Sequence, residues 1–120
     1  MEGGSDAYVQ RKVSATGRNF LLEASFYSNG CFLSISEGER KLGAISVALS
    51  SSSNTSVVKV IPSRNDPLFA NTVAEKVASM INGICAVSFH ATTQLRLEDM
   101  KAIMGEVMNI VEERKDKDGR

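Results

Sequence analysis

Apolar and polar residues alternate along the first half of the chain, and this alternation predicts β-strands. The alternating runs cover residues 20–27, 31–36, 42–49 and 56–61, and a less regular run covers residues 8–15. Successive side chains of a strand point to opposite faces, so a period of two indicates a strand with two distinct faces. Because no helical pattern separates these runs, we expect an antiparallel sheet rather than a parallel sheet with crossover helices.

Polar turns between the runs set the expected order of the strands. Asn29-Gly30 lies between two alternating runs and predicts a tight hairpin, since both residues tolerate a positive φ. Glu37 to Arg40 forms a second polar turn, and Ser50 to Thr55 forms a serine-rich loop. We therefore expect the run at residues 42–49 to pair with the preceding run as the next strand of a meander.

A helix from Asn65 to Gly83 is predicted at the start of the second half. Asp66 is expected to cap this helix, Pro67 suits its first turn, and Gly83 should adopt the left-handed conformation that ends it. Apolar residues recur along one face at intervals of three and four. These residues are Phe69, Ala70, Val73, Val77, Met80 and Ile81. We expect this face to lie on the sheet.

A further strand, at residues 84–91, and a second amphipathic helix, at residues 97–115, are predicted beyond this point. The expected fold class is therefore α+β. It consists of an antiparallel sheet of about six strands, a meander that is open or curled into a sandwich, with two amphipathic helices packed on one side. Residues 8–115 should form one domain between tails at residues 1–7 and 116–120.

The strands at residues 42–49 and 56–61 are apolar on both of their faces. Two helices cover only one face of a sheet, so the other face needs a second sheet layer or a partner chain. We therefore expect a curled sandwich, a dimer, or both. For the dimer contact we choose Gly43, Ile45 and Val47, although alternation does not tell which face the helices cover.

Composition restricts the class of protein and of partner. The 120 residues are 42% hydrophobic and 23% charged, which is typical of one globular domain. Lys and Arg number 14, as do Asp and Glu, which argues against nucleic acid or an anionic membrane as a partner. No segment approaches the roughly 20 apolar residues of a membrane span, and the first residues lack a signal-peptide pattern. We expect the cytoplasm, with the nucleus as a second candidate compartment.

Candidate chemistry is sparse. His90 is the single histidine, and no nucleophile motif accompanies it. Cys31 and Cys85 are isolated in the sequence, so we expect reduced core residues and no zinc site. The glycines match neither a phosphate loop nor a dinucleotide fingerprint, so no cofactor is expected. Three basic residues on predicted turns are candidate contacts for a partner protein. They are Arg40, Lys41 and Arg64.

Several short segments together resemble the proteasome assembly chaperone 3 family. The similarity extends from about Phe20 to Val111, and its most specific segment is the helix start at residues 65–68, Asn-Asp-Pro-Leu. The other segments are Lys41-Leu42-Gly43, Ala74-Glu75-Lys76-Val77, Ala86-Val87-Ser88 and Leu97-Glu98-Asp99-Met100-Lys101-Ala102-Ile103. None of these motifs is catalytic, and none is diagnostic alone.

This resemblance implies a non-enzymatic chaperone that works as a dimer, with itself or with a chain like proteasome assembly chaperone 4. In that family the dimer binds alpha-type subunits and promotes assembly of the 20S proteasome alpha ring. It binds on the side that later receives the beta ring, so it leaves before the particle matures. The family defines no short binding motif, so the resemblance assigns no contact residue in this chain.

Two other classes of function stay open on the residues alone. A dimerising adaptor of the roadblock or longin type also combines a sheet with two helices. Such folds place a helix between early strands, however, and the unbroken series of predicted strands from Phe20 to Ile61 counts against this class. An enzyme with a site assembled across a dimer would use His90 and Ser88.

Overall fold

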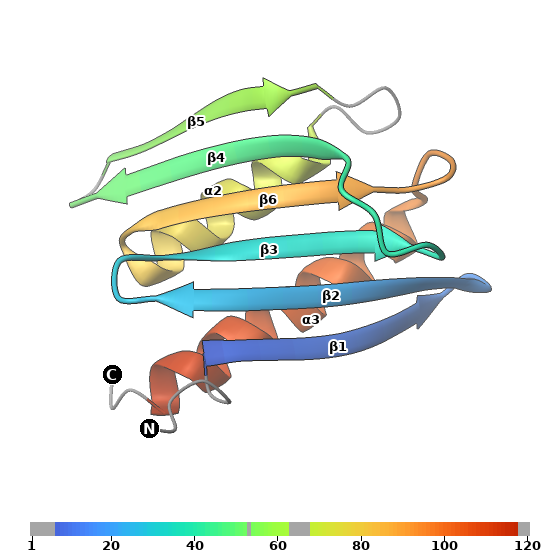
Figure 1. Ribbon diagram of the computed structural model, residues 1–120, viewed down its shortest axis with the longest axis horizontal. Coiled ribbons are helices and arrows are strands. Elements are labelled where there is room, and N and C mark those ends of the chain that lie inside the picture. Colours follow the sequence, from blue (N-terminus) through green and yellow to red (C-terminus); the bar gives the residue numbers. More distant parts are fainter. Residues whose placement is uncertain (1–6, 53, 63–67, 118–120) are drawn as a thin grey trace.

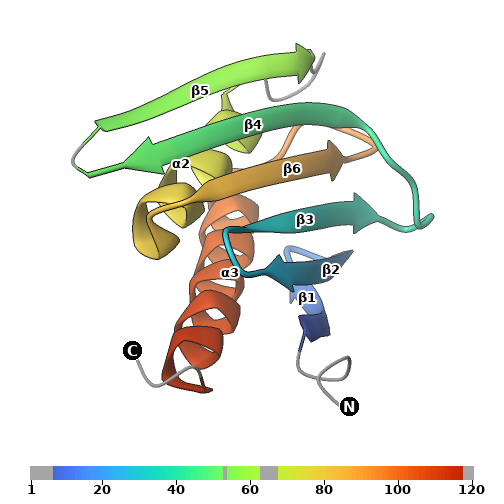
Figure 2. The ribbon, with the colours of Figure 1, turned by 60° about the vertical axis from the view of Figure 1, so that its left-hand side comes forward.

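The computed structural model describes residues 7–52, 54–62 and 68–117. Its elements form one sheet with two helices on the same face (Figures 1 and 2). In chain order they are β1 (Tyr8–Ala15), β2 (Arg18–Tyr27), β3 (Gly30–Glu37), β4 (Ala44–Ser51), β5 (Asn54–Ile61), α2 (Phe69–Ile81), β6 (Ile84–His90) and α3 (Leu97–Lys117).

The sheet is mixed, with strand order β1-β2-β3-β6-β4-β5. The predicted meander is therefore correct only for β1 to β3, since β6 enters between β3 and β4. It pairs in parallel with β3 and antiparallel with β4. Four of the seven β6 residues are buried, Cys85, Val87 and Phe89 on one face and Ser88 on the other. A strand buried on both faces suits the middle of a sheet better than its edge.

The helices divide the covered face between them. Helix α2 lies on β4 and β6, and α3 lies on β1 and β2. The predicted one-sided packing is thus confirmed, whereas the curled sandwich is wrong, because the described strands form a single open sheet. The core between sheet and helices consists of fully buried aliphatic residues, which include Leu22, Leu33, Ile35, Val73, Val77, Val87, Ile103 and Val107.

Helix α2 ends one residue earlier than the sequence predicts. Asn82, with φ of 52°, takes the left-handed conformation that we expected of Gly83. Asparagine tolerates this conformation because its short polar side chain can bond locally. Gly83 serves close packing instead, since a Cβ there would lie 2.6 Å from the carbonyl oxygen of Asn29. The predicted caps Asp66 and Pro67 lie outside the described residues.

The hairpin predicted at Asn29-Gly30 forms, but for a different reason. Gly30 is already the first residue of β3, opposite Tyr27, and neither Asn29 nor Gly30 has a positive φ. A Cβ on Gly30 would lie 2.5 Å from the carbonyl oxygen of Ile84 on β6. Glycine is required here by the neighbouring strand rather than by the turn.

Candidate interaction face

The sheet face opposite the helices carries a continuous group of apolar side chains. Residues paired across neighbouring strands share a face, and one such row runs through Val58, Val47, Ala86 and Phe32. We call the whole group the apolar patch. It comprises Phe32, Ile45, Val47, Leu49, Val58, Ile61, Ile84 and Ala86.

Several members of the apolar patch are in contact with water. Val58 is 65% exposed, Leu49 is 52% exposed and Ile84 is 40% exposed. Large contiguous apolar surfaces of this kind mark interaction sites in soluble proteins. The predicted contacts Ile45 and Val47 both belong to this patch and are half-buried in the isolated chain.

Gly43, the third residue chosen for a dimer contact, packs against β6. Its amide donates a hydrogen bond to Ser88 Oγ over 3.0 Å. A Cβ at this position would collide with the carbonyl oxygen of Phe89. The close backbone approach explains the glycine without any partner chain, and a dimer role for Gly43 stays a prediction.

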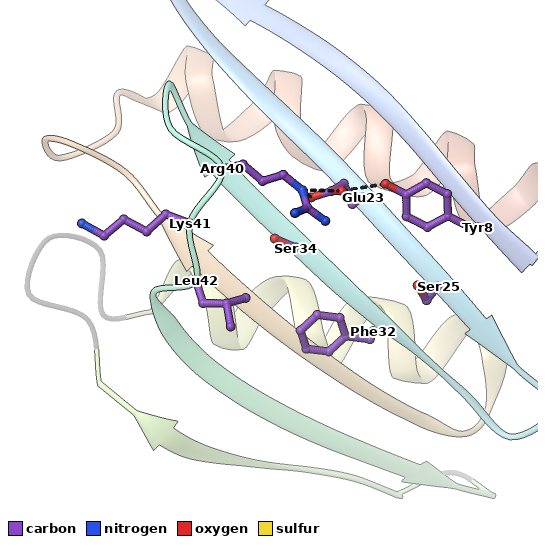
Figure 3. Close-up of a pocket in the computed structure, with 8 residues that line it drawn as sticks. All are labelled: Tyr8, Glu23, Ser25, Phe32, Ser34, Arg40, Lys41 and Leu42. Atoms are coloured by element: carbon purple, nitrogen blue, oxygen red, sulfur yellow. Dashed lines mark hydrogen bonds and ion pairs between the residues drawn. The ribbon is translucent and has the colours of Figure 1, made fainter.

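The other half of the same face is polar and is organised around Glu23 on β2. Glu23 is only 6% exposed. Its carboxylate accepts a hydrogen bond from the Tyr8 hydroxyl at 2.6 Å and from Arg40 Nε at 2.9 Å (Figure 3). Burial opposes ionisation of Glu23, but the hydrogen bonds from Tyr8 and Arg40 outweigh burial and lower its pKa. The carboxylate is therefore held as an anion that anchors Arg40.

The chain between β3 and β4 passes over this face and encloses a hollow. Its volume is about 280 Å³. Tyr8, Glu23 and Arg40 form its polar side, while Phe32 and Leu42 form its apolar side, next to the apolar patch (Figure 3). Leu42 is 63% exposed, so this loop adds apolar surface to the face.

The structure brings two of the three predicted partner contacts to this hollow. Arg40 and Lys41 both line it, and Arg64 lies outside the described residues. Sequence reasoning missed Tyr8 and Glu23. Glu23 carried a usable signal, because it is the single charged residue within an otherwise apolar or small run at residues 20–27. A lone carboxylate in such a strand needs a cationic or hydrogen-bonding partner nearby.

The residues that the sequence offers for catalysis or zinc binding all lie on strands of the sheet. Ser88 is fully buried and accepts the hydrogen bond from Gly43, while His90 is half-buried at the end of β6. Cys31 and Cys85 are free and buried, as expected, but they are direct neighbours on β3 and β6. The Cys31 thiol, followed by burial, raises the pKa of Cys85 and keeps it protonated.

Among residues 7–52, 54–62 and 68–117, no group of three or more His, Cys, Asp or Glu side chains is placed to hold a metal ion. No helix within these ranges has the length and hydrophobicity needed to cross a membrane.

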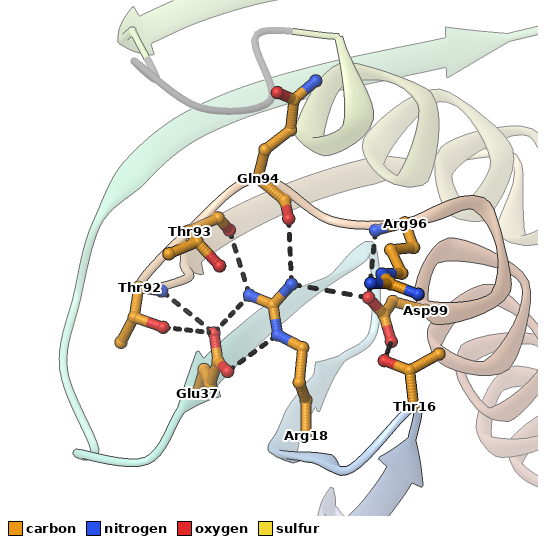
Figure 4. Close-up of polar contacts among 8 residues, drawn as sticks. All are labelled: Thr16, Arg18, Glu37, Thr92, Thr93, Gln94, Arg96 and Asp99. Carbon is orange, nitrogen blue, oxygen red and sulfur yellow. Dashed lines mark hydrogen bonds and ion pairs between the residues drawn. The ribbon is translucent and has the colours of Figure 1, made fainter.

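A second polar cluster, at one end of the sheet, joins the β1–β2 hairpin and the end of β3 to the segment that leads into α3 (Figure 4). Arg18 Nη2 contacts Glu37 Oε1 at 2.6 Å, and Arg18 Nε contacts Glu37 Oε2 at 2.9 Å. Fully buried Asp99 accepts hydrogen bonds from the Arg96 amide at 2.9 Å and from Thr16 Oγ1 at 2.7 Å. The Arg96 bond caps the start of α3. These groups bond to one another, so the cluster is a structural connection.

Comparison with known proteins provides a fold relationship. No protein-family model and no curated protein matches the sequence. The fold is similar to that of a solved structure described as a novel chaperone complex for yeast 20S proteasome assembly, with a TM-score of 0.56 and 15% sequence identity. The match covers 91% of this chain and 91% of the other. The chain therefore has the fold of a subunit from a 20S proteasome assembly chaperone complex.

Proposed function

We propose that this chain is a non-catalytic assembly chaperone for the 20S proteasome, related to the proteasome assembly chaperone 3 family. The observation that carries the proposal is the fold likeness to a chain of the yeast chaperone complex, which extends over 91% of both chains. The short segments described above point independently in the same direction. The order of elements also supports it, since no helix lies among the described residues from β1 to β5, unlike the adaptor folds.

The apolar patch supports the second part of the proposal, which is that the chaperone works as a pair. Burial of exposed hydrophobic side chains such as Val58 and Leu49 against a partner lowers the free energy, because it removes apolar surface from water. An open sheet with helices on one face accepts another sheet on its free face, as two-layer packings do. The partner is a second copy or a chain like proteasome assembly chaperone 4, and Ile45 and Val47 contact it.

The third part concerns the client. We propose that the pair binds alpha-type subunits, promotes alpha-ring assembly in the cytoplasm or nucleus, and leaves before the particle matures. Basic residues on the loops, Arg40, Lys41 and Arg64, contribute to partner binding. A transient complex needs an interface of modest size with a few strong contacts, because it must dissociate again.

The proposal is tested by affinity purification of the tagged chain from its own cells, followed by mass spectrometry. We expect alpha-type subunits and a second small chaperone, without mature proteasome. Val58→Asp should lose the small chaperone, because it places a charge in the apolar patch. The matched control is Ser79→Asp, which places the same charge on the exposed side of α2. Recovery of trafficking proteins with no proteasome subunit would instead favour the adaptor class.

A further inference from the structure

The hollow beside the apolar patch combines an apolar wall with guanidinium N–H donors that are not used in the ion pair between Arg40 and Glu23. We infer that it receives an acidic side chain, Glu or Asp, from the protein that covers this sheet face. The inference rests on the proposed pairing for its physiological partner. The hollow itself is a property of this chain and can be tested separately.

Arg40 is the main reason to expect a carboxylate. Both of its hydrogen bonds to Glu23 run through Nε, at 2.9 and 3.0 Å. The two terminal nitrogens of the guanidinium are therefore not used in the hydrogen bonds to Glu23. Its side chain is 73% exposed, so these nitrogens are accessible at the hollow (Figure 3). A guanidinium presents paired N–H donors in the geometry that a carboxylate accepts.

The charge balance of the hollow favours the same ligand. Glu23 and Arg40 neutralise each other as an ion pair. Lys41 also lines the hollow and forms no ion pair within the described part of the chain; its ammonium group points away from Glu23 and Arg40, so it adds a positive charge at the rim (Figure 3). The carboxylate of Glu23 already accepts bonds from Tyr8 and Arg40 and is nearly buried. An incoming anion would therefore meet cationic donors first.

The shape of the hollow suits a side chain with an apolar stem. Phe32 and Leu42 line one side and can contact methylene groups, while the charged groups line the other. The volume of about 280 Å³ compares with about 30 Å³ for one water molecule, so it holds several waters or one side chain. Since the apolar side adjoins the apolar patch, a protein seated on the patch reaches the hollow directly.

The hollow is tested by NMR titration of the full chain with N-acetylglutamate N-methylamide and with the matching glutamine compound. Val58→Asp is titrated in parallel, so that pairing through the patch does not occupy the hollow. We expect saturable shifts of Arg40 Nε–H and of the Phe32 and Ser34 amides with the acid and not with the amide. Arg40→Gln should remove the response, and added salt should weaken it.

Three outcomes would overturn the inference. One is the absence of a saturable shift in both the original chain and the Val58→Asp variant. The others are equal responses to the acid and the amide, or a response that survives in Arg40→Gln. Retention of the response in Glu39→Gln, a neighbouring exposed position, is the control for a general change in charge.

The purified pair separates this inference from the proposed function. Arg40→Gln should raise the dissociation constant about tenfold, as expected for loss of a hydrogen bond between charged groups, and Arg40→Lys should restore part of the affinity. If the pair forms and Arg40→Gln leaves its affinity unchanged, the hollow is not a carboxylate site and the proposed function stands. If the NMR titration shows carboxylate binding in the hollow and the chain forms no pair, the carboxylate site is supported and the proposed function is refuted.

Discussion

Replacing Glu37 by glutamine should weaken the connection between the sheet and the segment that leads into α3. The Glu37 carboxylate pairs with Arg18 through two contacts and accepts hydrogen bonds from the amide and hydroxyl of Thr92. Its side chain is 12% exposed and that of Arg18 is 16% exposed. Glutamine keeps the size of the side chain but removes the charge and replaces one acceptor oxygen by an NH2 donor, so the substitution tests the charge together with one hydrogen bond.

The magnitude follows from the ionisation of Glu37. Hydrogen bonding from Arg18 outweighs burial and, with the Thr92 bonds, lowers the pKa of Glu37 from 4.5 to about 2. A shift of this size corresponds to about 3 kcal/mol of preference for the charged form in the folded state. Because both side chains keep some contact with water, which screens their attraction, we expect Glu37→Gln to cost about 2 kcal/mol near neutral pH.

The pH dependence provides a sharper test than the cost alone. A carboxylate with a lowered folded-state pKa stabilises the fold above its unfolded-state pKa and loses this effect as the pH falls through the folded value. In urea unfolding, the difference between the original chain and Glu37→Gln should therefore be full above about pH 5 and shrink toward pH 2. Glu39→Gln, at an exposed carboxylate two residues beyond the end of β3, is the control. A difference that stays constant down to pH 2 would refute the reasoning.

Four other substitutions have expected outcomes. Leu22→Ala, at a fully buried position, should lower the free energy of unfolding by about 2–5 kcal/mol in urea titration. Gly43→Ala should destabilise by about 1–3 kcal/mol because its methyl group meets Phe89, whereas Gly105→Ala, with open space around it, should raise the thermal midpoint. Val58→Asp should convert the pair to monomers in sedimentation analysis, and it should leave the unfolding midpoint nearly unchanged at a concentration at which the original chain is also monomeric.

Each of these expectations also has a clear contrary result. A loss below about 1 kcal/mol in Leu22→Ala would mean that the core collapses around the gap. If alanine at Gly43 and alanine at Gly105 changed stability equally, close packing against Phe89 would not be the reason for glycine at position 43. A pair that survives in Val58→Asp would place the contact elsewhere on the molecule.

Local periodicity determined which segments become strands and helices. The alternation at residues 20–27 predicted β2, and its inward residues Phe20, Leu22, Ala24 and Phe26 are all buried. Helical spacing likewise predicted α2 and its buried face. These features depend on the direction in which neighbouring side chains point, which is a property of short segments. The resemblance to a chaperone family was also visible in short segments, and its functional content stays a proposal.

Only the tertiary structure decided how distant segments meet. The sequence contains no signal that β6 enters between β3 and β4, because that order depends on which strand is best buried on both faces once the helices have docked. The same insertion places Cys31 beside Cys85 and brings Ser88 to Gly43. The hollow around Glu23 and Arg40 arises in the same way, since its walls come from β1, β2, β3 and the loop before β4. Long-range pairing of this kind depends on the packing of the whole domain, and a local pattern does not record it.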